Sequence, residues 1–454
     1  MKNNKPTILI IVGISGDLSC RKLLPAISQI AATGMLPEQF KIVGVTRQKD
    51  IKINNILNCT TDKNYLKEHI ELFKMDLNDV NDYKKLGKYL EEIPARLEGH
   101  SGGEKTFGED AQRLFYLSVP PSVAKDIITF LGESGLAGKT GTKLLLEKPF
   151  GVDLESAAEL AKHIDKYFIP EQVYRIDHYM AKETAQNIIV FREGNSLFKK
   201  TWNKDFIESI NITASEQIGI EGRAIFYEQT GALRDVVQSH LLQLLALALM
   251  ELPKGDKFEE VPVLRLDALK HLNIPKDKSI SHYAKRGQYK SYRDEVGNEH
   301  SNVETFVSLA LQSDDPRWAG VPITLSTGKA LKNKFTEIKI LYRKDNNLES
   351  NELLLRIQPD EGISFSIFAK RPGYEHQISR HALDFFFKEH YRELPEPYEQ
   401  VLFNAINSDH SLFTSSNEVL ETWRILDALQ RTWAKSANDL IIYKEGSDIS
   451  EIVN

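Results

Sequence analysis

The chain has 454 residues, a formal net charge of −6 and a sequence pI near 6.1, so its length suits two to three domain-sized units. This mildly acidic net charge does not indicate a basic surface that would bind nucleic acid. No apolar run approaches the ~20 residues that span a bilayer. The only two cysteines, Cys20 and Cys59, indicate neither a disulfide framework nor a cysteine-rich zinc site.

The first 150 residues alternate between strand and helix patterns. A continuous aliphatic run at 7–12 predicts a strand buried on both faces, and a helical pattern follows through about Thr33. Because a short polar start leads straight into this strand, a signal peptide is not indicated, and we expect a cytoplasmic enzyme. Further strands are predicted at 41–45, 113–118 and 142–146, and a surface loop at 98–110. This alternation predicts βαβ units and a parallel sheet, as in a Rossmann-type domain.

A glycine loop, Gly13 to Leu18, follows the first strand. In parallel sheets ligands bind at the carboxyl ends of the strands, where this loop would offer backbone N–H groups and a helix N-terminus to a pyrophosphate. The loop lacks the full GxGxxG spacing, so an ordinary glycine turn explains it equally well. Arg47 follows the second strand, where an arginine can bind the 2′-phosphate of NADP and an acidic residue would favour NAD. A solvated surface arginine is the simpler alternative, but loop and arginine together predict NADP.

Two polar segments follow later strands of this region. In Glu147–Gly151, Pro149 cannot continue a sheet ladder, so Lys148 stands at the strand end and faces the expected cofactor cleft. An ordinary strand-end lysine is the simpler interpretation of Lys148 alone.

The second segment, Arg175–Glu183, concentrates carboxylate, imidazole, phenol and ammonium groups. His178, Tyr179 and Lys182 can donate hydrogen bonds to the phosphate of a sugar. Asp177 can instead orient a catalytic histidine from elsewhere in the chain. Taken alone, the segment is explained equally well as a strand end whose polar side chains hydrogen-bond within the protein and have no catalytic or binding role.

The pattern changes after residue 180. A helix is predicted from Lys182 through Phe191, followed by a strand at 207–214 that ends beside Glu216. Residues 228–251 predict a helix with a wide apolar face. Charged helices are predicted at 395–407 and 417–435, and strand-like runs at 302–312, 323–328, 335–343, 352–358 and 362–369. No helix of crossover length separates these runs, so they predict an antiparallel sheet.

The patterns together predict a Rossmann-type parallel-sheet domain at 1–180 and an α+β domain with a large, mainly antiparallel sheet at 181–454. Asp235 and His240 lie in the predicted helix 228–251, about 140° apart around an ideal helix. They could share a substrate only if it lay along the helix, unless Asp235 belongs to a distorted turn. A histidine in a leucine-rich helix is more often a hydrogen-bonded core residue.

Five motifs stand in order along the chain: GISGDL from Gly13, RKL from Arg21, EKPFG from Glu147, RIDHY with KE from Arg175, and GALRDVVQSHLLQ from Gly231. With Gly320-Val321-Pro322, Thr327-Gly328-Lys329 and Ile357 to Glu361, they make the chain resemble the glucose-6-phosphate dehydrogenase family over nearly its whole length.

The resemblance implies oxidation of glucose 6-phosphate with NADP, with NAD as a second candidate cofactor, in the first oxidative step of the pentose phosphate pathway. His240 is similar to the general base of the family, and Asp177 to the carboxylate that pairs with it. The implied substrate-binding residues are His178, Tyr179, Lys182, Lys148, Glu216, Asp235, Lys329 and Lys334. The implied cofactor-binding residues are Gly13, Ser15, Gly16, Asp17, Leu18, Arg21, Lys22, Arg47 and Lys148.

The resemblance also bears on partners. No metal is expected, because hydride transfer from a hemiacetal requires only a base and an ordered acceptor. No nucleic-acid or membrane partner is expected either. Assemblies in the family imply a homodimer or homotetramer, formed through the second domain.

Four positions depart from the family pattern. Ala181 replaces a glycine, Ser239 an asparagine, Ser326 an arginine, and Thr46 a small residue before Arg47. These changes leave affinity, cofactor choice and substrate open. One alternative is a related NADP-dependent dehydrogenase of an amino sugar phosphate or of free glucose. Another is a non-catalytic sugar-phosphate-binding regulator, which the presence of both His240 and Asp177 disfavours.

Overall fold

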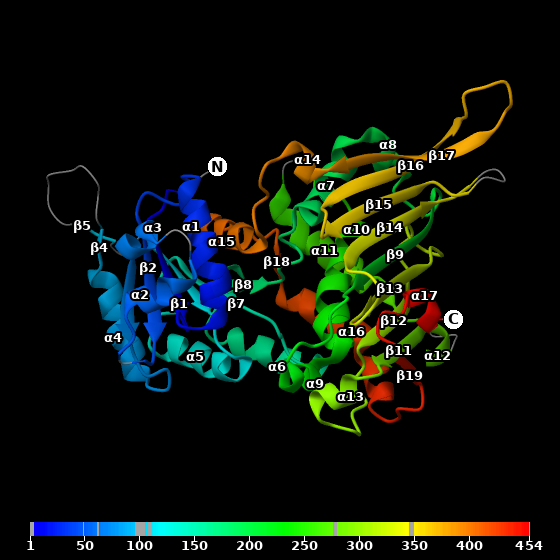
Figure 1. Cartoon of the computed structure of the whole chain (residues 1–454). Helices are drawn as coiled ribbons and strands as arrows, with labels where there is room; N and C mark the ends of the chain where they lie inside the picture. The colour runs from blue at the N-terminus through cyan, green and yellow to red at the C-terminus, as the bar shows by residue number, and fades with distance from the viewer. Residues whose placement is uncertain are drawn as a thin grey trace. The chain divides into compact units, whose positions relative to one another are not determined.

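The computed structural model describes residues 4–48, 50–60, 63–95, 105–107, 111–255, 257–275, 279–344 and 349–453. The chain forms two compact units, each with its own large sheet (Figure 1). The first unit comprises Met1–Gly151, Glu155–Ala181 and Pro395–Ser416, and the second comprises Val152–Leu154, Lys182–Leu394 and Asn417–Asn454. The surface loop predicted at 98–110 falls largely on residues outside this description.

A parallel sheet forms the centre of the first unit. Its strand order is β18-β8-β7-β6-β1-β2-β3, and every neighbouring pair is parallel except β18 with β8. The strands are β1 (Thr7–Val12), β2 (Phe40–Thr46), β3 (Ile70–Lys74), β6 (Gln112–Leu117), β7 (Thr142–Leu146), β8 (Val173–Ile176) and β18 (Phe413–Thr414). All six residues of β1 are buried, as expected for a central strand covered on both faces. The predicted Rossmann-type fold is therefore confirmed.

Helices surround this sheet. They are η1 (Ser19–Leu23), α1 (Leu24–Ala32), α2 (Ile53–Ile56), η2 (Leu57–Cys59), α3 (Asn64–His69), α4 (Val80–Glu92), α5 (Pro121–Glu133), α6 (Leu154–Ile164), η3 (Pro170–Gln172) and α15 (Pro397–Asn407). The short strands β4 (Pro94–Ala95) and β5 (Lys105–Thr106) pair with each other.

Helix α15 comes from the far end of the chain and returns to the first unit. Its residues Leu402 and Ile406 belong to the same buried apolar cluster as Ile27 of α1. At its C-terminus, the Nζ atom of the buried Lys143 donates to the backbone oxygen of Ala405 at 2.5 Å and to the Ser408 hydroxyl at 2.9 Å. A cation at this position satisfies carbonyl groups that have no partner within the helix.

The second unit contains a large mixed sheet. Among the described residues its order is β17-β16-β15-β14-β9-β13-β12-β11-β19, with β10 paired to β12. The strands are β9 (Ile207–Ser215), β10 (Leu272–Asn273), β11 (Ala284–Tyr289), β12 (Phe306–Ser313), β13 (Ile323–Gly328), β14 (Phe335–Tyr342), β15 (Glu352–Gln358), β16 (Gly362–Lys370), β17 (Ile378–Phe386) and β19 (Leu440–Tyr443). Most pairs are antiparallel, which confirms the predicted fold class. However, β9 lies between β13 and β14 and runs parallel to β13, so these two consecutive strands are not neighbours.

Helices pack on this sheet within the second unit. They are α7 (Glu183–Gly194), α8 (Ser196–Thr201), α9 (Ala224–Ala232), η4 (Leu233–Leu241), α10 (Leu242–Leu249), η5 (Phe258–Glu260), α11 (Val261–Lys270), α12 (Ile280–Tyr283), α13 (Tyr292–Val296), α14 (Phe387–His390), α16 (Ser416–Trp433) and α17 (Ile449–Val453). In the part of the chain that is described, none of the helices combines the length and the apolar character needed to cross a membrane.

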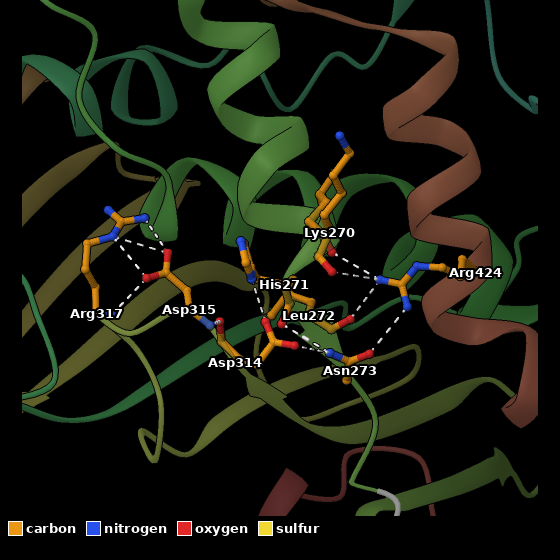
Figure 2. A network of polar contacts seen from close by, with 10 residues as sticks. Lys270, His271, Leu272, Asn273, Asp314, Asp315, Arg317 and Arg424 are labelled. Atoms are coloured by element: carbon orange, nitrogen blue, oxygen red, sulfur yellow. Dashed lines mark hydrogen bonds and ion pairs between the residues drawn. The ribbon is translucent and has the colours of Figure 1, made fainter.

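The C-terminus of α11 is held by a polar network (Figure 2). Arg424 of α16 donates to the backbone oxygen of Leu272 at 2.9 Å, just beyond the end of α11. In the same region the His271 Nδ1 atom lies 2.5 Å from Asp314, and Arg317 pairs with Asp315. These contacts join α11, α16 and the segment that follows β12.

Candidate active site

The glycine loop and Arg47 leave the parallel sheet at the same edge. Val12 of β1 is aligned with Val45 of β2, and the Gly13 N–H donates to the Val45 oxygen at 3.1 Å. Gly13 has a φ of 89°, and a Cβ on it would lie 2.3 Å from the Ser118 oxygen, so no other residue fits there without rearrangement. The loop, which includes Ser15 and Gly16, then enters helix η1.

Charged side chains follow this loop. Asp17 and Arg21 form an exposed ion pair at 2.6 Å, and Lys22 lies 3.9 Å from Glu396. Arg47 is exposed directly after β2. Backbone N–H groups, a helix start and three cations at one edge suit an anionic, phosphate-bearing cofactor.

Lys148 follows β7 and is joined to Pro149 by a cis peptide bond. The preceding Glu147 is half-buried and accepts hydrogen bonds from the phenols of Tyr116 and Tyr398. Burial raises the pKa of the Glu147 carboxyl, and these two hydrogen bonds and the charge of Lys148 act against the rise. Sequence reasoning missed this carboxylate, because Tyr398 comes from α15, far along the chain.

Asp177, His178 and Tyr179 follow β8, the parallel neighbour of β7. Asp177 is 3 % exposed, and its Oδ1 atom accepts the Tyr179 N–H at 3.1 Å. The His178 and Tyr179 rings lie 5.1 Å apart. The first unit therefore brings Lys148 and the RIDHY side chains to the same carboxyl edge as the glycine loop.

In the second unit, Asp235 and His240 lie on the π-helical segment η4. In a π-helix each N–H bonds the carbonyl five residues earlier, so residues five apart are linked by one hydrogen-bonded turn. The separation of about 140° around an ideal α-helix therefore does not apply to this segment, which is π-helical. Within this segment His240 is buried and Asp235 is half-buried. Such π-segments occur frequently at functional sites.

Glu216 and Lys329 form an ion pair beside this helix. The Lys329 Nζ atom lies 2.6 Å from Glu216 Oε2 and 5.4 Å from the centre of the Tyr227 ring. The pair is possible because β9 and β13 run parallel and end together, with Ser215 opposite Gly328. Burial raises the pKa of Tyr227, and the charge of Asp235 contributes to the rise. The buried Tyr227 phenol therefore lies beneath Lys329 and within electrostatic reach of Asp235 and Glu216.

Lys182 and Lys334, the other two lysines predicted to bind substrate, lie outside the Glu216–Lys329 pair. Lys182 precedes α7, and its Nζ atom lies 3.6 Å from the Glu361 carboxylate, which also accepts the Thr184 N–H at 2.9 Å. Glu361 is a partner of Lys182 that sequence reasoning did not assign. Lys334 is exposed before β14.

The positions that depart from the family pattern are accommodated locally. The Ser239 hydroxyl donates to the Asp235 backbone oxygen at 2.9 Å, within η4. Ser326 lies 3.1 Å from Ser308 across the β12–β13 pair. Thr46 accepts the Gln48 N–H at 3.1 Å, and Ala181 is fully buried. In the described part of the chain no group of three or more His, Cys, Asp or Glu residues could hold a metal ion.

Comparison with known proteins gives matches along nearly the whole chain. Residues 10–187 match the model described as glucose-6-phosphate dehydrogenase, NAD binding domain, and residues 189–452 match its C-terminal domain. The glucose-6-phosphate 1-dehydrogenase of Chlamydia muridarum is 34% identical, over 95% of this chain and 91% of that protein. That of Bacillus subtilis is also 34% identical, over 98% of this chain and 96% of the relative. A solved structure of glucose-6-phosphate dehydrogenase in complex with its substrate glucose-6-phosphate is similar with a TM-score of 0.87 and 30% identity, covering 100% of this chain and 98% of that one.

Proposed function

Because this chain belongs to the glucose-6-phosphate dehydrogenase family, we propose that it oxidises D-glucose 6-phosphate to 6-phospho-D-glucono-1,5-lactone with NADP as the hydride acceptor. As a member of this family it is an oxidoreductase with a nicotinamide cofactor. The reaction would be the first oxidative step of the pentose phosphate pathway. One observation supports the proposal most: η4 carries both Asp235 and His240 and lies beside the strands whose ends hold the Glu216–Lys329 pair.

His240 is the general base of the proposed reaction. It takes the proton of the C1 hydroxyl while the hydride leaves C1 for the bound nicotinamide ring, so the C1–O bond becomes a carbonyl and the lactone forms. An imidazole suits this role because its ordinary pKa lies near neutrality. We assign Asp177 the role of stabilising the protonated imidazole, since a carboxylate partner favours the charged form. Its burial in the RIDHY segment supports a fixed position.

The remaining residues hold the sugar phosphate in this proposal. His178, Tyr179 and Lys182 donate to the phosphate, and Lys148 contacts both substrate and cofactor. The carboxylates of Glu216 and Asp235 accept hydrogen bonds from sugar hydroxyls. Lys329 and Lys334 reach the substrate from the antiparallel sheet. The Glu216–Lys329 contact of 2.6 Å supports a joint action of these two residues.

The substrate is tested by steady-state kinetics on glucose 6-phosphate, glucosamine 6-phosphate and glucose, with NADP and with NAD. We expect kcat/KM on glucose 6-phosphate to exceed that on glucose by at least ~10-fold, because each charged hydrogen bond to the phosphate contributes about 1.5–3 kcal/mol. Better turnover of glucosamine 6-phosphate or glucose would favour the related sugar dehydrogenase. Binding without turnover of any sugar would favour the regulator.

Replacing Arg47 by alanine tests the choice of cofactor. We expect the KM for NADP to rise about 10- to 100-fold, because the variant loses a charge-assisted hydrogen bond to the 2′-phosphate. The KM for NAD should stay nearly constant, since NAD has no phosphate at that position. Lys52→Ala, which removes another exposed cation of the same unit, serves as the control. Equal losses with both cofactors would contradict the assignment of Arg47.

Domain roles, assembly and location complete the proposal. We assign cofactor binding to the region 1–180, and substrate binding and oligomerisation to the region 181–454. On the basis of family membership we propose a homodimer or homotetramer in the cytoplasm. Light scattering of the purified protein would decide between the two assemblies.

A further inference from the structure

The helix that carries Asp235 and His240 begins at a sharp break in the backbone. Gly231 has φ 62° and ψ −179°, between the main part of α9 and the start of η4. A Cβ on Gly231 would lie 2.4 Å from Glu304 Oε1. The left-handed φ favours glycine at the break, and any side chain there would also have to displace the Glu304 carboxylate.

Glu304 supplies hydrogen-bond acceptors to the first N–H groups of η4. Its backbone oxygen accepts the Ala232 N–H at 2.9 Å, and its Oε1 atom accepts the Leu233 N–H at 3.0 Å. The first N–H groups of a helix have no partner within it, and a carboxylate there is favoured by the helix dipole. Burial raises the pKa of the Glu304 carboxyl, while the Leu233 N–H and the charge of Arg234 act against the rise.

The next residue, Thr305, holds the backbone of Lys329. The Lys329 N–H donates to the Thr305 oxygen at 3.0 Å, and the Tyr443 hydroxyl donates to the Lys329 oxygen at 2.7 Å. The Thr305 and Tyr443 hydroxyls lie 2.8 Å apart. Residues 304 and 305, just before β12, thus connect the start of η4 to a lysine assigned to the substrate.

The starting point of η4 decides where its side chains lie. In a π-helix the hydrogen bonds link residues five apart, whereas in an α-helix they link residues four apart, so the two helix types turn their side chains to different directions. A change at the first turn would rotate Asp235 and His240 relative to the Glu216–Lys329 pair. We propose that Glu304 is a positioning residue, which fixes the start of η4 and thereby the setting of His240 and Asp235. This inference rests on the proposed function, in which His240 takes the proton.

Kinetics of Glu304→Ala and Glu304→Gln test the inference. We expect Glu304→Ala to lower kcat about 10- to 100-fold, the effect of a displacement near 1 Å. The KM for glucose 6-phosphate should change much less. The deuterium isotope effect on kcat, measured with substrate deuterated at C1, should increase because chemistry becomes slower than the other steps. Glu304→Gln retains an oxygen that accepts the Leu233 N–H and should restore most of the turnover.

A purely structural role predicts different results. If Glu304→Ala only lowered the fraction of folded protein, kcat would fall in proportion to that fraction and the isotope effect would not change. If Glu304→Gln failed to restore turnover, the hydrogen bond to the Leu233 N–H would not be what matters. Either result would overturn the inference. If Glu304→Ala does not fold, Glu304→Asp takes its place. Aspartate keeps the carboxylate on a side chain one methylene shorter, so we again expect a lower kcat and a larger isotope effect, but with a smaller loss of kcat. The control is Asp79→Ala, which removes a carboxylate that caps α4 in the first unit and should leave kcat and the isotope effect unchanged.

A crystal structure of the Glu304→Ala or Glu304→Asp variant gives a readout that does not depend on activity. We expect the first turn of η4 to change its hydrogen bonding and the His240 ring to move. An unchanged η4 would overturn the inference whatever the kinetics. Failure of the wild-type protein to oxidise glucose 6-phosphate would instead count against the proposed function, and the variant structure would still decide whether Glu304 sets the helix.

Discussion

His240→Asn is expected to lower kcat by ~10²–10⁴-fold, the usual contribution of a general base. Asparagine is close to histidine in shape and remains polar, so the buried position in η4 should stay filled. It cannot accept a proton near neutral pH, and the C1 hydroxyl would then have to lose its proton to water. Substrate binding should persist, because the phosphate and hydroxyl contacts belong to other residues. Initial rates at the absorbance band of the reduced nicotinamide measure turnover, and calorimetric titration with glucose 6-phosphate measures binding.

A second histidine of the same unit provides the matched control. His271 lies beside the carboxylate of Asp314 in the network at the end of α11 (Figure 2), but it is 40% exposed. His271→Asn therefore removes a histidine–aspartate pair outside the proposed site and should leave kcat unchanged. If His240→Asn kept near-normal turnover, or if the two variants lost similar amounts, His240 would not be the base.

The sequence was most informative where a pattern is local. The strand predicted at 142–146 matches β7, and the one at 323–328 matches β13, because continuous apolar runs are typical of buried strands. The Gly13 loop was also correctly placed after the first strand, since its glycines follow that strand directly. Local patterns therefore sufficed for the parallel sheet, and they place the predicted cofactor loop directly after its first strand.

The prediction was incomplete where distant segments meet. One continuous helix was expected at 228–251, but its apolar spacing does not reveal the break at Gly231 or the π-helical geometry of η4. The start of η4 is bonded to Glu304, which is more than sixty residues away in the chain. Likewise β9 pairs with β13 although more than one hundred residues separate them, and α15 returns to the first unit. Pairings of this kind depend on tertiary packing, and the local sequence carries no signal for them.

The second large effect is expected in stability, at the buried ion pair between α11 and α16. Arg265 Nε lies 2.8 Å from Glu418 Oε1, and both side chains are fully buried. In Arg265→Ala the carboxylate stays buried without its arginine, which should lower the free energy of unfolding by about 3–5 kcal/mol. Urea unfolding followed by fluorescence measures the loss. Arg424→Ala is the control, because this exposed arginine lies on α16, like Glu418, but mainly caps α11, so its removal should cost less.

Removing both charges together should behave differently from removing one. In the double variant Arg265→Met/Glu418→Leu no charge is left buried, and the apolar side chains can fill the space, so stability should return to the wild-type value or exceed it by about 1–4 kcal/mol. Turnover should also be kept, because Thr422 of α16 would still accept the hydrogen bond from Gln238 of η4, at 2.9 Å in the wild type. A double variant as unstable as Arg265→Ala would show that attraction within the pair outweighs the cost of burying it. A stable double variant with low turnover would instead show that the pair itself sets the distance between α16 and the helix of His240.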